Sequence, residues 1–347
     1  MTHPSDAVPA AHRISIVVPV YQGERTLRAL IDEILPLTTR TYSPSGRPLV
    51  VEEVLLVFDH GPDGSADVIR ELVRDHSFVR GVWLSRNFGQ HPATLAGMAS
   101  SGGEWIVTMD EDGQHDPADI GGLLDTALDR QSSVVYAKPT NAAPHGMWRN
   151  AASRGSKWLI ATAMGADSTV SYQSYRLVLG EVGRSVAAYA GSEAYLDVAL
   201  GWIAGEVTTS PVELREEHGR RSGYNVRTLL SHFWRMVLSS GTKGLRLVSF
   251  IGVAFAILGL VLVLWVLASY LVFDVGTEVQ GWASTMVILL FGFGATLFSL
   301  GVVAEYVGVN VKTAMGKPPY LIVADPADGP LGRTDTRDGP PEPTTPA

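Results

Sequence analysis

Two acidic residues follow an apolar, β-branched run that is typical of a buried strand. The run covers 105–109, Asp110 comes next, and Asp112 lies two positions later. Because side chains two residues apart in an extended chain point the same way, both carboxylates can lie on one side. Such a pair can hold one hard divalent cation, Mg²⁺ or Mn²⁺, which would neutralise a diphosphate. An acidic loop that caps the next helix is the alternative interpretation.

The residues just after this pair are also ambiguous. Asp116 precedes Pro117, which is the pattern of a helix N-cap followed by a proline in the first turn. A cap is therefore favoured for Asp116, with an acid/base role as the alternative. His115 is either a residue of the site or an ordinary surface residue.

Two further turns follow strand-like runs. Gly and Pro in the turn 58–65 force a sharp bend, where Asp59 can accept hydrogen bonds from a ribose or base and Asp63 caps the next helix. In the turn 85–91, Arg86 and Asn87 can contact the phosphates and sugar of a nucleotide.

These turns need a scaffold, and the chain from about residue 13 to 214 alternates short apolar runs with helical stretches, as α/β proteins do. Runs that are apolar throughout predict parallel strands covered on both faces, with ligands at their carboxyl ends. Strands are expected at 14–20, 54–58, 79–84, 105–109, 133–137 and 207–214, and helices at 25–35, 65–74, 91–100, 117–130 and 148–164.

Composition narrows the function classes. The chain has 347 residues and a formal net charge of −8, which argues against a general nucleic-acid binder. It contains no cysteine, so disulfides, thiolate zinc sites and a cysteine nucleophile are excluded.

The last third contains two long uncharged stretches, 247–273 and 279–304. About 20 apolar residues cross a bilayer, so both are predicted as membrane spans rather than as buried helices of a soluble core. Basic residues flank the outer ends and are missing from the short connecting loop, which predicts that the region before the spans and both termini face the cytoplasm of a cell membrane. Residues 1–12 lack the apolar core of a signal peptide.

The segments around these stretches have their own signatures. Residues 227–238 carry apolar side chains at helical spacing, which predicts a helix in the membrane interface or, alternatively, a linker helix. The basic region 218–246 suits phosphate, either of lipid headgroups in general or of a specific phospholipid substrate. Proline and glycine enrichment after residue 323 predicts disorder.

Nine motifs follow one another from about Ile14 to Val323. They are Val17-Val-Pro-Val-Tyr21, the Asp59 turn, Leu84-Ser-Arg-Asn-Phe-Gly89, Asp110-x-Asp112-Gly-Gln114, Arg220-Arg-Ser-Gly-Tyr224, Gly281-Trp-Ala-Ser284, Glu305-Tyr306, Lys312 and Pro318-Pro-Tyr320. In combination, they resemble the motifs of the polyprenyl-phosphate glycosyltransferases. These are inverting GT-A enzymes related to dolichol-phosphate mannose synthase and to bacterial undecaprenyl-phosphate glucosyl- and aminoarabinosyltransferases.

This resemblance implies an α/β GT-A domain with a Rossmann-like, mostly parallel sheet at 13–226, an amphipathic juxtamembrane helix at 227–246, spans at 247–273 and 279–304, and a cytoplasmic segment at 305–323. Residues 1–12 and 324–347 are expected to be disordered. The implied reaction moves a sugar from a nucleotide sugar, with a UDP-sugar favoured, to undecaprenyl or decaprenyl phosphate with inversion. The product would serve cell-envelope glycan assembly or modification. Membrane lipids and a second copy of the chain are the further partners considered, and nucleic acid is not expected.

The resemblance also implies a set of site residues. Asp110, Asp112 and Gln114 would hold Mg²⁺ or Mn²⁺, and Asp112, Asp116 and Glu193 are the catalytic candidates. The substrate-binding candidates are Pro19, Tyr21, Glu24, Asp59, Arg86, Asn87, Gly89, Asp110, Gln114, Arg176, Arg220, Ser222 and Tyr224.

The chain departs from the family pattern in two places. One is the loop Arg215-Glu-Glu-His-Gly219-Arg-Arg-Ser222, which is spaced differently from the usual Arg-x-x-Gly-x-Ser. The other is the segment 173–176. Many relatives have Gly-Asp-Phe-Arg where this chain has Gln173-Ser174-Tyr175-Arg176, so an aspartate proposed as base is missing. The acceptor phosphate, with a second pKa of about 6, is already largely ionised, so placing it in line with the leaving diphosphate suffices. The alternative function is a catalytically weak nucleotide-sugar-binding or scaffold subunit of a membrane complex. A processive synthase would show a Gln-x-x-Arg-Trp motif, and a transporter would need more spans.

Overall fold

The structure is a computed structural model of the whole chain. It describes residues 10–141, 173–191, 195–204, 207–215 and 281–329, together with the isolated positions 252, 253, 257, 259, 261 and 264. The predicted helix at 148–164 and the juxtamembrane helix at 227–246 lie outside the described residues.

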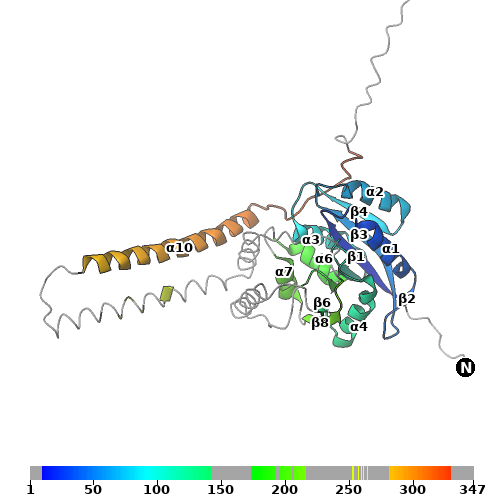
Figure 1. Ribbon diagram of the computed structural model, residues 1–347, viewed down its shortest axis with the longest axis horizontal. Helices are drawn as coiled ribbons and strands as arrows, with labels where there is room; N and C mark the ends of the chain where they lie inside the picture. The colour runs from blue at the N-terminus through cyan, green and yellow to red at the C-terminus, as the bar shows by residue number, and fades with distance from the viewer. Residues whose placement is uncertain are drawn as a thin grey trace, which may run out of the picture.

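A nine-stranded sheet forms the centre of the described domain, in the order β8-β6-β7-β5-β1-β3-β4-β9, with β2 paired to β3 (Figure 1). Neighbouring strands run parallel from β5 through β1 and β3 to β4, and β6 is parallel to β8. The short strands β7 and β9 are antiparallel to their neighbours. The strands are β1 (His12–Val20), β2 (Thr41–Tyr42), β3 (Pro48–Phe58), β4 (Val79–Leu84), β5 (Trp105–Thr108), β6 (Val134–Pro139), β7 (Arg176–Leu179), β8 (Val207–Val212) and β9 (Ile322–Val323).

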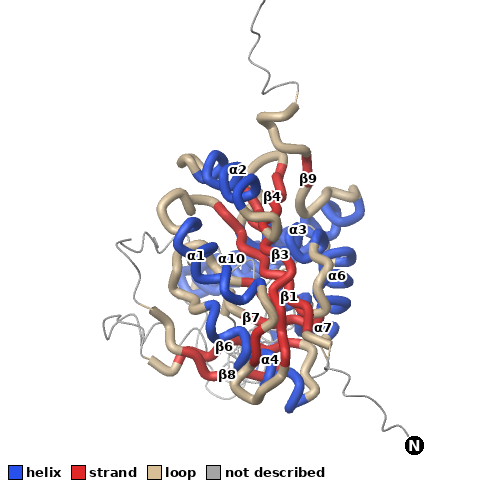
Figure 2. Tube along the Cα trace, turned by 90° about the vertical axis from the view of Figure 1, so that its right-hand side faces the viewer, coloured by secondary structure: helices blue, strands red, loops and turns tan. Residues whose placement is uncertain are grey.

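Helices cover both faces of the sheet, which explains why the central strands are apolar throughout. One buried cluster joins Ile16 and Val18 of β1 to α1, α2 and α4, and the other joins Val17 to α3, α6 and α7. Figure 2 shows α3, α6 and α7 on one side of β1 and β3, with α1 and α2 on the other. The helices are α1 (Leu27–Ile34), α2 (Ser65–Asp75), α3 (Gln90–Ser100), α4 (Ile120–Arg130), α6 (Gly180–Tyr189), α7 (Leu196–Ile203) and α10 (Trp282–Ala314), with 3₁₀ turns at Leu35–Thr38 and Pro117–Asp119.

The predicted α/β architecture with a mostly parallel sheet is confirmed. The strand at 79–84 has the predicted bounds, and the other predicted strands and helices in the described residues are present with shifted ends. The largest shift is in β3, which begins at Pro48 instead of residue 54. The short strands β2, β7 and β9 were missed, because a few residues that pair with a distant partner leave little periodicity in the sequence.

The described residues include one helix that is long and apolar enough to cross a membrane, with the candidate span at Phe291–Ala314. It belongs to α10, which continues beyond the predicted end of the second span at residue 304, because the charged Glu305 does not interrupt the helix. In the first predicted span, 247–273, the few described positions are helical and most residues lie outside the described part.

The chain returns to the sheet after α10. Strand β9 pairs with the end of β4, and Ser85 N donates to Leu321 O over 2.9 Å. Asp325 then accepts two 2.7 Å hydrogen bonds from Arg70 of α2, whose guanidinium lies over Trp83. Residues 324–329, the start of the tail predicted to be disordered, are therefore attached to the catalytic domain through this ion pair.

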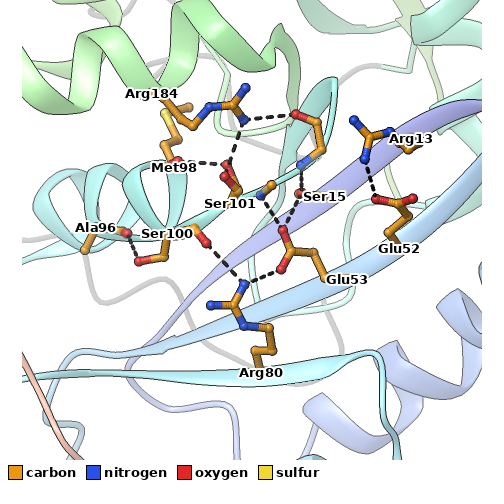
Figure 3. A network of polar contacts seen from close by, with 12 residues as sticks. Arg13, Ser15, Glu52, Glu53, Arg80, Ala96, Met98, Ser100, Ser101 and Arg184 are labelled. Carbon is orange, nitrogen blue, oxygen red and sulfur yellow. Dashed lines mark hydrogen bonds and ion pairs between the residues drawn. The ribbon is translucent and has the colours of Figure 1, made fainter.

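A half-buried carboxylate joins the strands on the edge opposite the predicted site. Glu53 of β3 accepts hydrogen bonds from Ser15 Oγ at 2.8 Å and Gly102 N at 2.6 Å, and it is ion-paired with Arg80 (Figure 3). Arg184 of α6 donates to Gly103 O at 2.9 Å beside it. This polar network connects β1, β3, β4 and α6 and leaves the carboxyl ends of the strands to the site.

Candidate active site

The carboxyl ends of β1, β3, β4 and β5 lie side by side, because these strands are parallel neighbours. Their loops, 21–24, 59–64, 85–89 and 109–116, therefore gather at one edge of the sheet. Strand β7 runs the opposite way between β5 and β6, so the residues before it, 173–175, reach the same edge. Local sequence patterns singled out the loops 59–64, 85–89 and 109–116, whereas the loop 21–24 and the segment 173–175 entered the prediction only through the family resemblance.

Asp110 is held by donors from two other segments. Gln90 Nε2 of α3 donates to Asp110 Oδ1 at 2.6 Å, and Ser174 Oγ donates to Asp110 Oδ2 at 2.5 Å. Ser174 occupies the position where the resemblance led us to expect an aspartate. A second carboxylate there would repel Asp110, whereas the hydroxyl fixes its orientation.

Asp112 turns back on its own loop. Its Oδ1 accepts from Gln114 N at 3.1 Å, around Gly113 with a φ of +76°. That left-handed conformation favours glycine. The turn keeps Asp112 close to the end of β5 and to Asp110.

His115 is a buried residue of the fold. Its Nδ1 accepts from Asp110 N at 3.0 Å, and its ring stacks on Tyr175 with centroids 4.8 Å apart. Burial lowers the pKa of His115. The nearby charges of Asp110 and Asp112 act in the opposite direction, but the pKa remains below its ordinary value. The imidazole thus acts as a neutral support behind the two carboxylates.

Glu111, between the two aspartates, was missed in the sequence. Its two carboxylate oxygens accept from Tyr21 N and Gln22 N, each at 2.9 Å. Glu111 therefore ties the loop after β1 to the loop after β5. Its position between two site aspartates could have indicated a role for Glu111 in the site. Its hydrogen-bond partners could not be predicted, because they lie about ninety positions away in the chain.

Asp59 organises the loop after β4. Its Oδ1 and Oδ2 accept from Phe88 N and Gly89 N, each at 2.7 Å, and its side chain is buried. Burial raises the pKa of Asp59, while these backbone hydrogen bonds lower it. The Asp59 carboxylate was predicted to accept hydrogen bonds from a ribose or base, but in the structure it accepts them from the protein backbone. Gly89, one of the two donors, has a φ of +98°.

The loops after β1 and β3 touch closely. A Cβ on Gly61 would overlap Tyr21 O, so only glycine fits. Glu24, a predicted substrate-binding residue, accepts from Gly64 N at 3.1 Å. Asp63 accepts from Ser65 N at 3.3 Å at the start of α2, close to its predicted capping role.

Several predicted substrate-binding side chains remain accessible at this edge. Tyr21, Arg86 and Asn87 are exposed, and Pro19 and Gln114 are half-buried. Arg86 lies over the Phe88 ring at 4.2 Å. The edge therefore carries a guanidinium and amide groups beside the acidic loop.

Asp116 is the N-cap of the 3₁₀ turn that precedes α4, as predicted: its Oδ1 accepts from Ala118 N at 2.9 Å. Its Oδ2 pairs with Arg215 at 2.7 Å, and Arg215 also pairs with Glu33 at 2.7 Å. Both oxygens are engaged in structure, which disfavours an acid/base role for Asp116.

Arg176 differs from its predicted substrate-binding role. Its guanidinium is almost fully buried, ion-paired with Asp197 of α7, and it donates to Thr108 Oγ1 at 3.0 Å. Tyr136 OH donates to the same Asp197 at 2.9 Å. A group enclosed in this way supports the sheet and does not face a ligand.

Four predicted residues, Glu193, Arg220, Ser222 and Tyr224, lie outside the described residues. In the described part of the chain, no group of three or more His, Asp or Glu side chains is arranged to hold a metal ion. The donors that are present, the carboxylates of Asp110 and Asp112 and the amide of Gln114, have the oxygen chemistry that Mg²⁺ and Mn²⁺ prefer.

A mostly parallel sheet with helices on both faces and an acidic turn at its carboxyl edge defines a GT-A-like α/β domain. In agreement, residues 15–171 match the model of the family described as Glycosyl transferase family 2. The predicted resemblance to the polyprenyl-phosphate glycosyltransferases is confirmed by this match and by the relatives that follow.

Two relatives match nearly the full chain. Undecaprenyl-phosphate 4-deoxy-4-formamido-L-arabinose transferase from Pseudomonas aeruginosa (strain LESB58) is 29% identical over 316 residues, covering 89% of each chain. The protein of the same name from Yersinia pestis (strain Pestoides F) is 28% identical, covering 89% of this chain and 92% of the relative. Among solved structures, glucosyl-3-phosphoglycerate synthase from Mycobacterium tuberculosis, with Mn²⁺, UDP and phosphoglyceric acid, has 16% identity and a TM-score of 0.46, covering 67% of this chain and 78% of that one.

Proposed function

We propose that this chain is a membrane-bound inverting glycosyltransferase that transfers a sugar from a nucleotide sugar to the phosphate of a polyprenyl lipid. The observation that carries the proposal is the similarity to undecaprenyl-phosphate transferases over 89% of both chains. This similarity extends beyond the catalytic domain, so it favours the lipid acceptor over a soluble one.

The carboxyl edge of the sheet supplies the groups that such a reaction needs. Asp110 and Asp112, with Gln114, would hold Mg²⁺ or Mn²⁺, and oxygens of the diphosphate would complete the coordination. The cation would supply positive charge where the diphosphate leaves. Arg86 and Asn87 are exposed beside the acidic loop and can bind the phosphates and sugar.

The transfer itself needs little proton chemistry. An oxygen of the ionised acceptor phosphate attacks the anomeric carbon, the bond from that carbon to the diphosphate oxygen breaks, and the nucleoside diphosphate leaves with the electron pair. No proton has to be removed, which is compatible with a serine, Ser174, beside Asp110. The protein's contribution is to hold the acceptor on the face opposite the leaving group.

The test is to incubate the purified full-length protein with Mg²⁺, undecaprenyl phosphate and a panel of UDP-, GDP- and TDP-sugars, and to identify lipid products by mass spectrometry. We expect one sugar-phosphate lipid, lost on addition of EDTA. Asp112→Asn should abolish it while the protein stays folded in membranes, whereas Asp129→Asn, on the exposed face of α4, should not. No product with any donor would support the alternative, a nucleotide-sugar-binding scaffold subunit.

A further inference from the structure

Three large apolar side chains at the ends of α6 and α7 are exposed. Tyr189, the last residue of α6, is 84% exposed, and Trp202 and Ile203 at the end of α7 are 65% and 46% exposed. We call these three residues the α6–α7 surface. The buried side of α7, with Leu196 and Leu200, already packs on the core, so the exposed side chains contribute nothing to it.

This surface lies where the membrane helix meets the domain. A Cβ on Gly191, two residues after α6, would lie 3.8 Å from Thr313 Oγ1 in the last turn of α10. Figure 1 shows α7 on the side of the domain from which α10 projects, whereas β2 lies on the far side. The end of α6 is therefore close to the final turn of α10, and α7 lies on the same side of the domain.

The length of α10 places its final turn at the bilayer boundary. The 33 residues of α10 extend over about 50 Å at 1.5 Å per residue, against about 30 Å for the hydrocarbon core, and its charged residues Glu305 and Lys312 lie in its C-terminal third. Its ends must therefore enter the headgroup region. Thr313 lies at one of these ends and Lys317 follows it, as expected for a segment near lipid phosphates.

We propose that the α6–α7 surface docks on the lipid bilayer and inserts Tyr189 and Trp202 at the level of the headgroups. Tyrosine and tryptophan combine an apolar ring with a polar group, and they are enriched where apolar and aqueous phases meet. A bilayer is the occupant that the position favours, since the end of α6 lies beside the final turn of α10, a helix apolar enough to cross a membrane. The inference rests on the proposed function in one respect, the insertion of α10 in a membrane.

Such docking has a consequence for the proposed reaction. Membrane-spanning helices alone leave the domain free to tilt on the membrane, whereas a further contact on α7 would restrict the tilt. Asp197 of α7 is ion-paired with Arg176, which in turn contacts Thr108 at the end of β5. Helix α7 is thus connected through Arg176 to β5, the strand that precedes Asp110.

The absence of cysteine from the chain allows a direct test. Single cysteines are introduced as Trp202→Cys, Tyr189→Cys, Tyr42→Cys or Phe298→Cys in the full-length protein, labelled with a nitroxide and reconstituted in vesicles of phosphatidylglycerol and phosphatidylethanolamine. Tyr42 of β2 is the matched control, because it is an aromatic residue with 61% exposure on the far side of the domain. Phe298 in α10, 59% exposed, reports insertion of the anchor.

The readout is the collision of the label with O₂, which concentrates in lipid, and with a water-soluble nickel complex. We expect O₂ to dominate at 298, both quenchers to reach the labels at 189 and 202 with O₂ in excess, and the nickel complex to dominate at 42. If the label at position 298 is in lipid but the labels at 189 and 202 show the same accessibility as the label at 42, the docking inference is wrong and the membrane anchor stands. If 298 itself is in water, the anchor fails. Labels at 189 and 202 that neither quencher reaches would indicate a protein contact and would also overturn the inference.

Discussion

Ser174 Oγ, just before β7, donates a 2.5 Å hydrogen bond to Asp110 Oδ2, just after β5. The antiparallel pairing of these two strands brings the residues together, although more than sixty positions separate them in the chain. Together with Gln90, this contact sets the direction in which the Asp110 carboxylate faces.

Removing this hydroxyl should weaken metal binding without unfolding the protein. For Ser174→Ala we expect about 10- to 100-fold weaker Mn²⁺ binding, because groups that orient a metal-binding carboxylate usually contribute that much. Electron paramagnetic resonance of free Mn²⁺ gives the affinity, independently of turnover. Ser101→Ala removes a 2.7 Å hydroxyl contact to Met98 O on the opposite edge and should leave Mn²⁺ affinity unchanged. Equal affinities for the Ser174 variant and the wild type would refute the positioning role.

A methyl group at Gly61 should displace the loop after β1. Because the added Cβ overlaps Tyr21 O, Gly61→Ala should lower the free energy of unfolding by about 3 kcal/mol, in the upper part of the usual cost of overpacking. Chemical denaturation in detergent measures this change. Gly122→Ala in α4 has open space around its Cβ and should be neutral or slightly stabilising. A Gly61 variant as stable as the Gly122 variant would contradict the close contact of the two loops.

The buried ion pair of Arg176 and Asp197 should be sensitive to loss of one partner. Asp197→Ala leaves a buried guanidinium without its counter-charge, so we expect destabilisation of about 3–5 kcal/mol. Asp67→Ala removes an exposed partner of Arg70 and should cost less than about 1 kcal/mol. Replacing both buried partners with apolar residues should recover part of the loss. If denaturant titrations give similar losses of unfolding free energy for the two aspartate variants, the ion pair of Arg176 and Asp197 is not buried as described.

Glu53 should make stability depend on acid pH. Burial by itself raises the pKa of Glu53, but hydrogen bonds from Gly102, Ser15 and Arg80 lower it below the ordinary value of 4.5. The ionised carboxylate therefore stabilises the fold above pH 4.5, and this contribution is lost as the pH falls through the lowered pKa of the folded state.

The corresponding measurement compares unfolding of wild type and Glu53→Gln across this range. The variant should be less stable at neutral pH, and the difference should shrink below pH 4.5. Glu52→Gln, on the same strand with an exposed side chain, is the control and should follow the wild type throughout. A difference between the Glu53 variant and the wild type that does not vary with pH would show that charge is not the cause.

The features that could be predicted from the sequence depend on residues close together in the chain. Apolar runs followed by Gly, Asp and Pro predicted β1, β3, β4 and β5 and placed Asp110 and Asp112 after a strand, because side-chain alternation and turn chemistry act between neighbours in the chain. The helix cap at Asp116 could be predicted for the same reason.

The contacts that could not be predicted join residues far apart in the chain. The insertion of β7 beside β5 brings Ser174 to Asp110 and encloses Arg176, and the return of the chain after α10 adds β9 to β4. Glu111 meets Tyr21 N only once the loops after β1 and β5 are adjacent. Each contact joins segments that no local pattern relates, since strand pairing is settled by the packing of the whole sheet.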